Sequence, residues 1–237
     1  MSKLVYGRNP VLSSLGENRV EKIFLEEHFS DKAFLAKVND KRIIPERVSK
    51  SKLDEMSSNA VHQGVVASVL DFRYYSLAEI LTSCHDKPFP LLLVLDSLKD
   101  PHNLGAILRT CDAFGVDGII IKKHDQVPLN ATVAKVSTGA IDHVKVAIET
   151  NLSNVIQKLK DEGFWIVATD GEAKVSYTEI DCKRPLALIL GSEGEGVSHL
   201  LIQRSDYVIK IPMAGHVNSL NVSVAAGILI ANIIANR

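Results

Sequence analysis

The sequence lacks any run of eighteen or more apolar residues, and so lacks the length of apolar helix that a membrane span requires. Its most apolar stretch, residues 222–235, is interrupted by Ser223, Gly227 and Asn232, which is typical of a buried helix. The first ten residues, MSKLVYGRNP, contain no apolar signal-peptide core. Together these absences predict a cytoplasmic protein.

Cysteine is also scarce in this chain of 237 residues. Cys84, Cys111 and Cys182 are odd in number and are never spaced as Cys-x-x-Cys, so the sequence indicates neither a disulfide framework nor a zinc site. The eight histidines follow no ligand spacing either. We therefore expect free thiols in a reducing compartment, and no metal.

An excess of positive charge is missing as well, since the formal net charge is −1 and the pI is near 6.7. Proteins that bind nucleic acid usually carry a basic face, so the overall charge does not predict an RNA partner. Residues 1–73 nevertheless contain 12 Lys and Arg against 10 Asp and Glu, while the remainder contains 15 against 18. Any surface that binds phosphate is therefore local, and the N-terminal part is the better candidate.

The first seventy residues contain short mixed elements, which predict a small α/β domain over residues 1–72. We expect helices at 10–15, at 31–38 with Ser30 as N-cap, and at 52–56. Strands are expected at 22–25 and over the β-branched run at 64–70. Residues 73–89 differ in character and are predicted as a linker that contains a helix at 77–83.

From residue 90 to 237, apolar runs alternate with segments of helical spacing. This pattern predicts an α/β domain with a parallel sheet that is covered on both faces. Ligands bind at the carboxyl ends of the strands in such sheets, so the loops after Leu95, Leu190 and Ile211 are the candidate site. The expected strands are 91–95, 118–121, 165–168, 186–190 and 208–211, and the expected helices are 104–114, 131–136, 152–160 and 197–203.

The first of these loops ends in Asp-Pro-His-Asn and leads into a helix. Capping of that helix is the simpler interpretation of Asn103. Gly105 in the first turn costs about 1 kcal/mol relative to alanine, so we expect some group to approach its backbone closely. Arg109 either pairs with Asp112 on the helix surface or serves a site.

The second loop, GSEGEG at 191–196, is spaced GxxGxG rather than the GxGxxG of dinucleotide-binding folds. Its two glutamates would repel a pyrophosphate, and no Walker A lysine is present. A flexible turn is the simpler interpretation of the three glycines. A neutral or cationic nucleoside such as S-adenosylmethionine suits this loop better than a polyphosphate.

The third loop runs from Ile211 to Ser219-Leu220-Asn221, which opens the last helix. Either Ser219 or Asn221 is expected as the N-cap of that helix. Two polar side chains beside Leu220 are more than a cap requires, which indicates a site. Met213, in the same loop, belongs to a residue type that fills cores more often than it contacts a cofactor.

Taken together, the strings DPHNLGAILRTCDAFG, LILGSEGEGV and IPMAGHVNSLNVSVAAG resemble the signature motifs of the SpoU (TrmH-like) branch of the SPOUT RNA methyltransferases. Their order and spacing agree with the family, and KVSTGAIDHVKV at 135–146 is also similar. This resemblance covers about residues 90–237. Shorter strings at residues 5–11 and 62–67 resemble the small RNA-binding domain of the RlmB group, whose members methylate a guanosine ribose in 23S ribosomal RNA.

The resemblance implies a fold and partners that residue spacing alone does not. It implies a parallel-sheet α/β catalytic domain with a C-terminal trefoil knot over residues 90–237, and a small N-terminal α/β RNA-binding domain over 1–72. It also implies S-adenosylmethionine as cofactor, 23S ribosomal RNA as partner, and a homodimer with its site at the subunit interface.

The same resemblance implies which residues form the site. The matching catalytic positions are Asn103, Arg109, Glu193, Ser219 and Asn221. The candidate cofactor-binding residues are Gly191, Gly196, Ile211, Met213 and Leu220. The candidate RNA-binding residues of the N-terminal domain are Arg8, Asn9, His62 and Gln63.

Arg109 is central to the mechanism that these residues suggest. We expect it to bind the phosphate next to the target ribose and to stabilise the alkoxide that develops at the 2'-oxygen. Because an arginine is not deprotonated in proteins, this role is favoured over that of general base. We expect Asn103 and Asn221 to orient Arg109 and the ribose, Ser219 to hydrogen-bond either of them, and Glu193 to order its loop or to pair with Arg109.

Two other functions stay open at this point. One is a tRNA ribose 2'-O-methyltransferase with the same catalytic domain. The other is a non-catalytic RNA-binding or ribosome-assembly protein that retains a methyltransferase fold.

Overall fold

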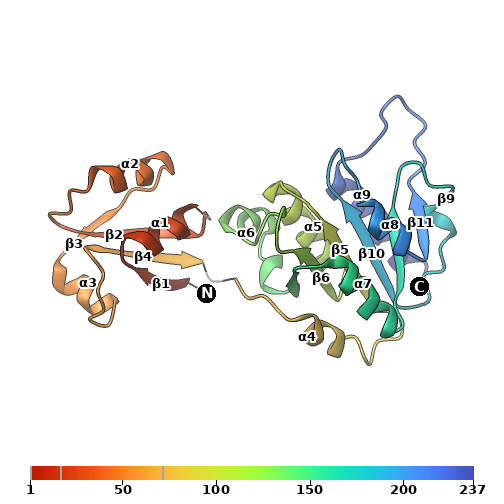
Figure 1. Ribbon diagram of the computed structural model, residues 1–237, viewed down its shortest axis with the longest axis horizontal. Helices are drawn as coiled ribbons and strands as arrows, with labels where there is room; N and C mark the ends of the chain where they lie inside the picture. Colours follow the sequence, from red (N-terminus) through yellow and green to blue (C-terminus); the bar gives the residue numbers. More distant parts are fainter. Residues whose placement is uncertain (1, 17, 71) are drawn as a thin grey trace. The chain divides into compact units, whose positions relative to one another are not determined.

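The computed structural model describes residues 2–16, 18–70 and 72–237, which form two compact units (Figure 1). The first unit runs from the start of the described chain to Phe72 and includes Asn130–Thr132. The second unit comprises Arg73–Leu129 and Val133–Arg237. Each unit has a buried hydrophobic cluster of its own.

The first unit contains a mixed sheet in the order β1-β4-β2-β3. Strand β4 pairs antiparallel with both β1 and β2, and β2 pairs parallel with β3. The β-branched run of β4 is almost wholly buried because it lies in the middle of this sheet, next to the unit's core. The elements are β1 (Ser2–Tyr6), α1 (Arg8–Gly16), β2 (Val20–Glu26), α2 (Lys32–Asp40), β3 (Glu46–Val48), α3 (Lys50–Met56) and β4 (Val65–Leu70).

Helix α2 begins one residue later than the sequence suggests. The side chain of Asp31, not that of Ser30, caps it by accepting a hydrogen bond from the backbone N–H of Phe34 at 3.0 Å. The prediction of Ser30 as N-cap was therefore wrong, because Asp31 occupies the position from which a side chain reaches the third helical N–H. Strands β1 and β3 were not predicted, since both are short and mostly exposed and lack apolar alternation.

The second unit is built on a sheet in the order β7-β6-β5-β10-β8-β11-β9, in which every neighbouring pair is parallel. The prediction of a parallel α/β sheet is confirmed. Its strands are β5 (Leu91–Asp96), β6 (Gly118–Lys122), β7 (Val146–Glu149), β8 (Trp165–Thr169), β9 (Val175–Ser176), β10 (Leu186–Gly191) and β11 (Tyr207–Lys210). Its helices are α4 (Leu77–Thr82), α5 (Pro101–Phe114), α6 (Ala131–Ser137), α7 (Leu152–Asp161), α8 (His199–Arg204) and α9 (Val222–Ala235), with short 3-10 turns at Ala140–Asp142 and Tyr177–Glu179.

Helices lie on both faces of this sheet (Figure 1). Alternate residues of the strands, such as Leu92 and Val94 of β5, share one buried cluster with apolar residues of α4, α7 and α8. The intervening residues, such as Leu93 and Leu95, are also buried, and on the other side α5 packs against α9 and α9 against β10. Because both faces are covered, the strands contain continuous apolar runs rather than alternating ones.

The segment at 73–89 is ordered against the second unit. Helix α4 begins with a capping box, in which Ser76 and Glu79 satisfy each other's backbone N–H groups. Ile80 of this helix is fully buried against Gly118, where a methyl group would lie 2.7 Å from the Ile80 side chain. This predicted linker is thus part of the core of the second unit.

Neighbouring strands β5 and β10 determine where a ligand can bind. From β5 the chain continues to β6 and β7 on one side, and from β10 it crosses to β11 on the other side. Asp96 and Gly191 are register partners at the carboxyl ends of the two strands, so the loops that follow them leave the sheet side by side. A parallel sheet binds its ligands at such a point, where the strand order reverses.

The three cysteines lie in the interior of the protein. Cys84, Cys111 and Cys182 are free and buried, and burial raises the pKa of Cys84 to about 11. In the part of the chain that the structure describes, no helix has both the length and the apolar character to cross a membrane.

Candidate active site

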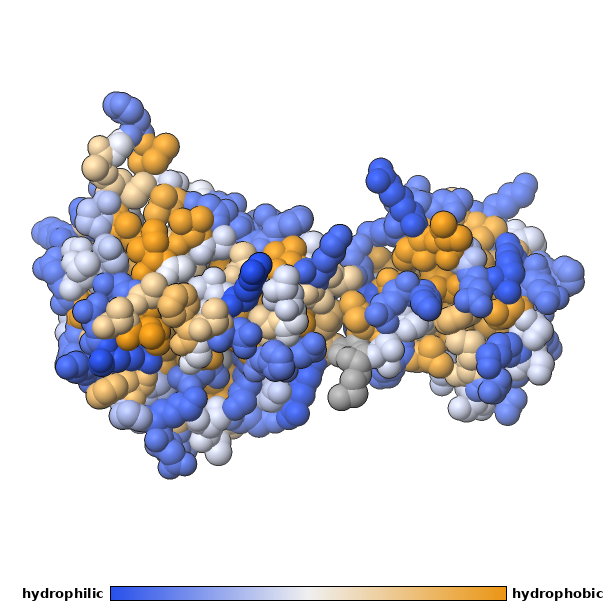
Figure 2. Space-filling view, turned by 180° about the vertical axis from the view of Figure 1, so that it is seen from behind, coloured by the Kyte–Doolittle hydropathy of each residue, from blue (hydrophilic) through white to orange (hydrophobic). Residues whose placement is uncertain are grey.

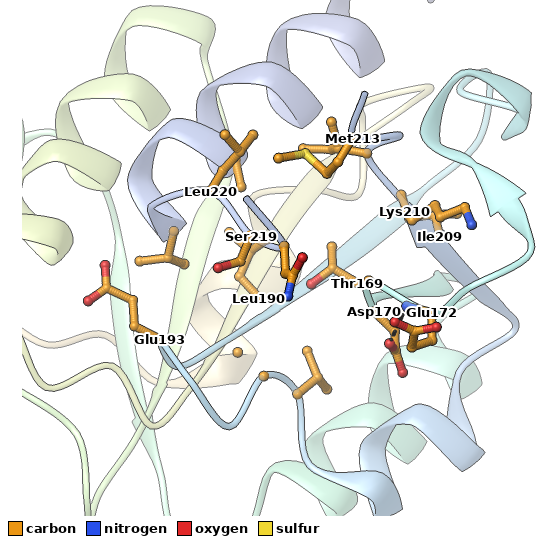
Figure 3. A pocket seen from close by; sticks show the side chains of 18 of the residues that line it. Thr169, Asp170, Glu172, Leu190, Glu193, Ile209, Lys210, Met213, Ser219 and Leu220 are labelled. Atoms are coloured by element: carbon orange, nitrogen blue, oxygen red, sulfur yellow. Dashed lines mark hydrogen bonds between the residues drawn. The ribbon is translucent and has the colours of Figure 1, made fainter. Parts of the chain in front are cut away.

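A cavity of about 940 Å³ opens at the carboxyl ends of β8, β10 and β11 (Figure 3). Its wall is formed by the segments 169–172, 190–197, 209–213 and 217–222, together with parts of α8 and α9. Gly191, Ile211 and Leu220, which are distant in sequence, all line it. Two of the three predicted loops, those after Leu190 and Ile211, therefore line one cavity, whereas no residue of the loop after Leu95 does.

Gly191 cannot be replaced without moving the backbone. A methyl group built on it would lie 1.9 Å from the carbonyl carbon of Gly196 and 2.1 Å from the backbone nitrogen of Val197. The loop folds back in this way because the backbone N–H of Ser192 donates to the carbonyl oxygen of Gly196, and that of Gly196 donates to the carbonyl oxygen of Ser192. Gly194 and Gly196 have positive φ angles of 98° and 69°. The three glycines thus form a tight turn rather than a flexible one.

Asn103 does not cap helix α5. Asp100 does so, since it accepts a hydrogen bond from the backbone N–H of His102 at 2.9 Å, and this bond holds the pKa of Asp100 below its ordinary value. The prediction of Asn103 as N-cap was wrong because Pro101 begins the helix two residues earlier. Asn103 instead lies in the first turn of α5 and is 6% exposed. Its carboxamide is not used for capping and can hydrogen-bond other side chains.

The side chains of Asn103, Glu193 and Asn221 form a closed network. The Nδ2 atoms of both asparagines donate to Glu193 Oε1 at 2.8 Å, and Asn221 Nδ2 also donates to Asn103 Oδ1 at 2.9 Å. One side chain of each motif is thereby hydrogen-bonded to the side chains of the other two. Because Glu193 and the residues around Asn221 also line the cavity, this network connects the start of α5 to the cavity wall.

Asn221 has two functions at once. Its Oδ1 accepts hydrogen bonds from the backbone N–H groups of Ser223 at 2.9 Å and Val224 at 3.3 Å, which makes it the N-cap of α9. Its Nδ2 is used in the network described above. Of the two N-cap candidates, Asn221 is thus the cap, and Ser219 lines the cavity with no side-chain hydrogen bond to the described residues.

The buried carboxylate of Asp96 holds the segment that directly follows the glycine turn. This side chain accepts a hydrogen bond from the backbone N–H of Ser198 at 3.0 Å and one from the Ser97 hydroxyl at 3.2 Å. Lys122 Nζ lies 3.9 Å from it. Asp96 therefore ties the ends of β5 and β6 to the residue that begins α8.

Arg109 is exposed on α5, and it makes no hydrogen bond or ion pair with the described residues. The alternative in which Arg109 pairs with Asp112 is absent, and so is a pairing of Arg109 with Glu193. Arg109 also does not line the cavity of its own chain. Its guanidinium is thus available to a group from outside.

Gly105 is approached by protein rather than by a ligand. A methyl group at this position would lie 2.7 Å from Val136 Cβ and 3.1 Å from the carbonyl oxygen of Val133, both on α6. The expected close approach exists, and its reason is the packing of α5 against α6.

The predicted cofactor-binding residues all line the cavity. Gly191 and Gly196 belong to the turn after β10, Ile211 and Met213 to the loop after β11, and Leu220 to the mouth of α9 (Figure 3). Met213 is partly exposed at the wall and does not fill the core.

Sequence reasoning missed one wall of the cavity, which consists of Thr169, Asp170, Gly171 and Glu172 after β8. Asp170 accepts a hydrogen bond from the backbone N–H of Glu172 and thereby shapes this turn. The signal was available, because Asp-Gly directly follows a predicted parallel strand, and every such strand end faces the same edge of the sheet.

The cavity suits a nucleoside that carries no phosphate groups better than a nucleotide polyphosphate. Its volume lies in the range of about 300–1,000 Å³ that small-molecule sites have. Apolar side chains such as Leu190, Ile211 and Leu220 provide surface for a flat base, while the Gly191–Gly196 turn brings peptide groups close to it. The lining contains four carboxylates, at Asp170, Glu172, Glu193 and Glu195, and one lysine, Lys210, which favours a cation over an anion. Among the described residues, no cluster of His, Cys, Asp and Glu could hold a metal ion.

The predicted RNA-binding residues lie in the first unit. Arg8, His62 and Gln63 line a second cavity there, of about 1060 Å³, whereas Asn9 is exposed beside it in sequence without lining it. His62 is 6% exposed, with Nε2 placed 3.0 Å from Asp54 Oδ1 and Nδ1 accepting from the backbone N–H of Gly64. Both of its ring nitrogens are thus occupied within the protein.

Comparisons with known proteins agree with this geometry. Residues 90–231 match the model of the SpoU rRNA Methylase family, and residues 4–75 match the model described as RNA 2'-O ribose methyltransferase substrate binding. A putative TrmH family tRNA/rRNA methyltransferase of Staphylococcus aureus (strain COL) is 43% identical over 239 residues, which cover 99% of this chain and 96% of the relative.

Two solved structures extend the comparison. An AdoMet-bound rRNA methyltransferase from Sinorhizobium meliloti is 26% identical with a TM-score of 0.64, and the match covers 98% of this chain and 86% of that one. The TrmH/SpoU tRNA modifying enzyme of A. aeolicus is 32% identical with a TM-score of 0.59, over 68% of this chain and 82% of that one.

Fold and cavity thus define an α/β methyltransferase whose cofactor is S-adenosylmethionine. More particularly, the chain belongs to the SpoU rRNA methylase family.

Proposed function

We propose that the protein transfers the methyl group of S-adenosylmethionine to a ribose 2'-hydroxyl of RNA. The observation that carries this proposal is the network of Asn103, Glu193 and Asn221, which joins three distant motifs at the edge of the cavity. A chain that had only retained the fold would not need to keep this polar network complete.

Cofactor binding is assigned to the residues of the cavity wall. Gly191, Gly196, Ile211, Met213 and Leu220 hold the nucleoside through backbone groups and apolar contacts. When bound, S-adenosylmethionine supplies an electrophilic methyl group on a sulfonium sulfur. We assign the loops after β10 and β11 to the trefoil knot of the family.

Among the catalytic residues, Arg109 acts on the RNA. Its free guanidinium binds the phosphate beside the target ribose and stabilises negative charge as the 2'-hydroxyl loses its proton. Ser219 hydrogen-bonds the ribose, and the network of Asn103 and Asn221 fixes the position of Glu193 and its loop. The 2'-oxygen would take the methyl group that S-adenosylmethionine supplies and would give up its proton to water, with S-adenosylhomocysteine as the second product.

The site is completed in a homodimer. Six residues of α-helix rotate by about 240° and rise about 9 Å, so Arg109 leaves α5 on a different side from Asn103 and does not line its own cavity. A second copy can bring its Arg109 to this cavity. Helix α9 contains no charged residue, and Val224 on it is half exposed. Figure 2 shows apolar residues gathered on the second unit next to its projecting loop, which provides a surface for such an assembly.

The first unit selects the RNA. Arg8, Asn9 and Gln63 are the proposed contact residues, and His62 holds their loop in place through its bonds to Asp54 and Gly64. We propose 23S ribosomal RNA as the substrate and a guanosine as the target, in the cytoplasm. A tRNA target is the second candidate, which is favoured by the 32% identity to the tRNA modifying enzyme of A. aeolicus.

Single-turnover methylation tests the role of Arg109. We expect Arg109→Ala to lower the chemical rate by about 100-fold or more, as removal of one charge-stabilising donor does elsewhere, and Arg109→Lys to retain a measurable part. Affinity for S-adenosylmethionine stays at the wild-type value in both variants. A full chemical rate with Arg109→Ala would remove Arg109 from the mechanism.

Mass spectrometry of RNA fragments after incubation with isotopically labelled cofactor tests the substrate. Labelled 2'-O-methylguanosine in 23S fragments, and none in tRNA, is the expected result. Label in tRNA alone would replace the ribosomal target with the second candidate. Failure of the protein to bind S-adenosylmethionine in a calorimeter would contradict the enzymatic function itself.

A further inference from the structure

The cavity of the first unit is built from three segments that its sheet brings together. These are the start of α1 at Arg8, the end of β2 at Glu26 with residues 28–31 of the turn that follows, and the loop 60–64 before β4. Lys50 and Asp54 of α3 lie at the edge. Its volume of about 1060 Å³ is ample for one nucleotide.

The walls of this cavity are fixed by contacts within the unit. Arg8 Nη1 donates to Asp31 Oδ2 at 3.0 Å, and its guanidinium carbon lies 5.1 Å above the ring of Phe29. Gln63 Oε1 accepts a hydrogen bond from the backbone N–H of Arg8 at 3.1 Å, which orients its carboxamide. His62 fixes the rest of the loop through Asp54 and Gly64. The site is therefore already formed before any ligand binds.

Gly64 keeps two of these walls close together. A methyl group built on it would lie 3.0 Å from Phe29 Cδ2 and 3.2 Å from Glu26 Oε2. The carboxylate of Glu26 is thus held beside an aromatic ring and next to the Gln63 peptide. A carboxylate in this position can accept hydrogen bonds from a flat group that enters the cavity.

Several hydrogen-bonding groups of the cavity have no partner in the protein. Three of them make no hydrogen bond or ion pair with the described residues: the Glu26 carboxylate, Gln63 Nε2 and Lys50 Nζ. They offer one acceptor group and two donor groups. Beside them, Val61 is 82% exposed and presents an apolar surface at the cavity.

The charges exclude a site for phosphate alone. Three carboxylates, at Glu26, Asp31 and Asp54, face two cations, at Arg8 and Lys50, and His28 is at the edge. A site for the RNA backbone would carry an excess of cations instead. An acceptor and donors beside aromatic and apolar surfaces match the edge and face of an unstacked nucleobase.

We propose that this cavity binds a single unstacked guanine of the RNA substrate. Guanine alone among the four standard bases places two N–H donors, N1–H and the N2 amino group, beside the O6 acceptor on one edge. Glu26 accepts from the two donors, Gln63 Nε2 donates to O6, and the base lies against Val61 and the Arg8 guanidinium that covers the Phe29 ring. The proposal rests on the proposed function, because it takes RNA to be the substrate, and it makes that substrate a single-stranded loop or bulge rather than a duplex.

Fluorescence anisotropy with short RNAs tests the proposal on the full chain. The probes are octauridylates with one central guanosine, inosine, adenosine or cytidine, and a blunt duplex that contains the same guanosine. We expect the guanosine probe to bind about tenfold more tightly than the adenosine and cytidine probes. Inosine, which lacks the N2 amino group, should fall between them, and the duplex should bind no better than adenosine.

Two neighbouring carboxylates provide a matched pair of variants. Glu26→Gln should abolish the preference for guanosine, because an amide cannot accept from both donors. Glu27→Gln, the same change one residue away and outside the cavity, should retain it. Equal melting temperatures of both variants and equal affinity for S-adenosylmethionine show that each unit is still folded.

Three results would overturn the proposal: equal affinity for all single-base probes, a guanosine preference that survives Glu26→Gln, or no binding of any single-stranded probe. The proposed function fails in a different way. In that case the wild-type protein transfers no methyl group to ribosomal or transfer RNA, whatever its preference among the probes.

Discussion

The two cavities of this protein are built in opposite ways. The one in the second unit is made by backbone that folds on itself at Gly191, and Glu193 in its wall is hydrogen-bonded to Asn103 and Asn221, which are also bonded to each other. The one in the first unit leaves Glu26 and Lys50 without partners among the described residues. A closed network suits a cofactor that is always the same, whereas unpaired groups suit a macromolecule that must be distinguished from others of its kind.

The largest expected effect is that of Gly191→Ala in the cofactor cavity. Because a methyl group at this position would collide with the backbone of Gly196 and Val197, the turn must open. Overpacking of about 3 kcal/mol corresponds to a loss of about 100-fold in affinity. Calorimetric titration with S-adenosylmethionine measures it.

Gly215→Ala is the control for that experiment. Gly215 lines the same cavity, but a methyl group there meets nothing within 4 Å. Its affinity for the cofactor should equal that of the wild type. Similar losses in both variants would mean that the turn at Gly191 has no special role.

Replacement of Asn103 by alanine breaks the closed network without touching the turn. It removes one donor from Glu193 and one acceptor from Asn221. Because both of these partners are exposed to water, each lost hydrogen bond costs about 1 kcal/mol. We expect the single-turnover rate to fall by about 10- to 100-fold, with little change in cofactor affinity. Asn154→Ala, at an exposed position of α7, is the control, and an equal rate in the two variants would contradict the role of the network.

A smaller effect is expected for Gly64→Ala in the first unit. Gly64 has a φ of +77°, and an L residue in this region costs about 1–2 kcal/mol. RNA affinity should therefore fall severalfold while cofactor affinity stays the same. Gly16→Ala, where a methyl group meets nothing within 4 Å, should change neither value. A loss of cofactor binding in Gly64→Ala would show that the two cavities do not work separately.

The cap of α5 gives a pH-dependent prediction for the second unit. Asp100→Ala should lower the free energy of unfolding by about 1 kcal/mol at neutral pH. Because the hydrogen bond from His102 lowers the pKa of Asp100, this contribution is present above the unfolded pKa of about 4 and is lost as the pH falls through the folded pKa. Denaturant titrations at several pH values measure it.

Asp100→Asn separates the cap from its charge. An asparagine caps helices about as well as an aspartate does, so the variant should keep most of the stability and lose the pH dependence. A pH dependence that is the same in Asp100→Asn and in the wild type would assign it to another group.

The smallest effect concerns the thiols, all of which lie in the second unit. Burial keeps them protonated, and with the Cys84 pKa raised to about 11 little thiolate exists at pH 8. A disulfide reagent should therefore label the native protein slowly, and its rate in denaturant should report unfolding of the second unit alone. Fast labelling before any loss of circular dichroism would contradict this burial.

The sequence allowed most of the second unit to be predicted, because strands such as β5 and β10 are continuous apolar runs separated by helical segments. It did not reveal β7 or β9, which are short and partly exposed. The capping residues were the least predictable feature. Asp31 and Asp100 compete with neighbouring Ser30 and Asn103, and only the backbone angle of each helix start decides between them.

The sequence predicted that the motif loops follow the ends of strands, but it did not predict which side chains hydrogen-bond each other. Spacing placed Asn103, Glu193 and Asn221 at strand ends, and the mutual hydrogen bonds that join them depend on how the sheet orders β5 beside β10. The same limit applies to Glu26. Nothing in its neighbourhood along the chain shows that Gly64, thirty-eight positions later, will hold it at a cavity.

The double use of Asn221 has a consequence for how this enzyme can change over time. A single carboxamide both caps the last helix and belongs to the amide–carboxylate network. A substitution of Asn221 therefore changes thermal stability and catalytic rate together. A laboratory selection for thermal resistance alone would therefore also preserve the geometry of the reaction there, without ever assaying it.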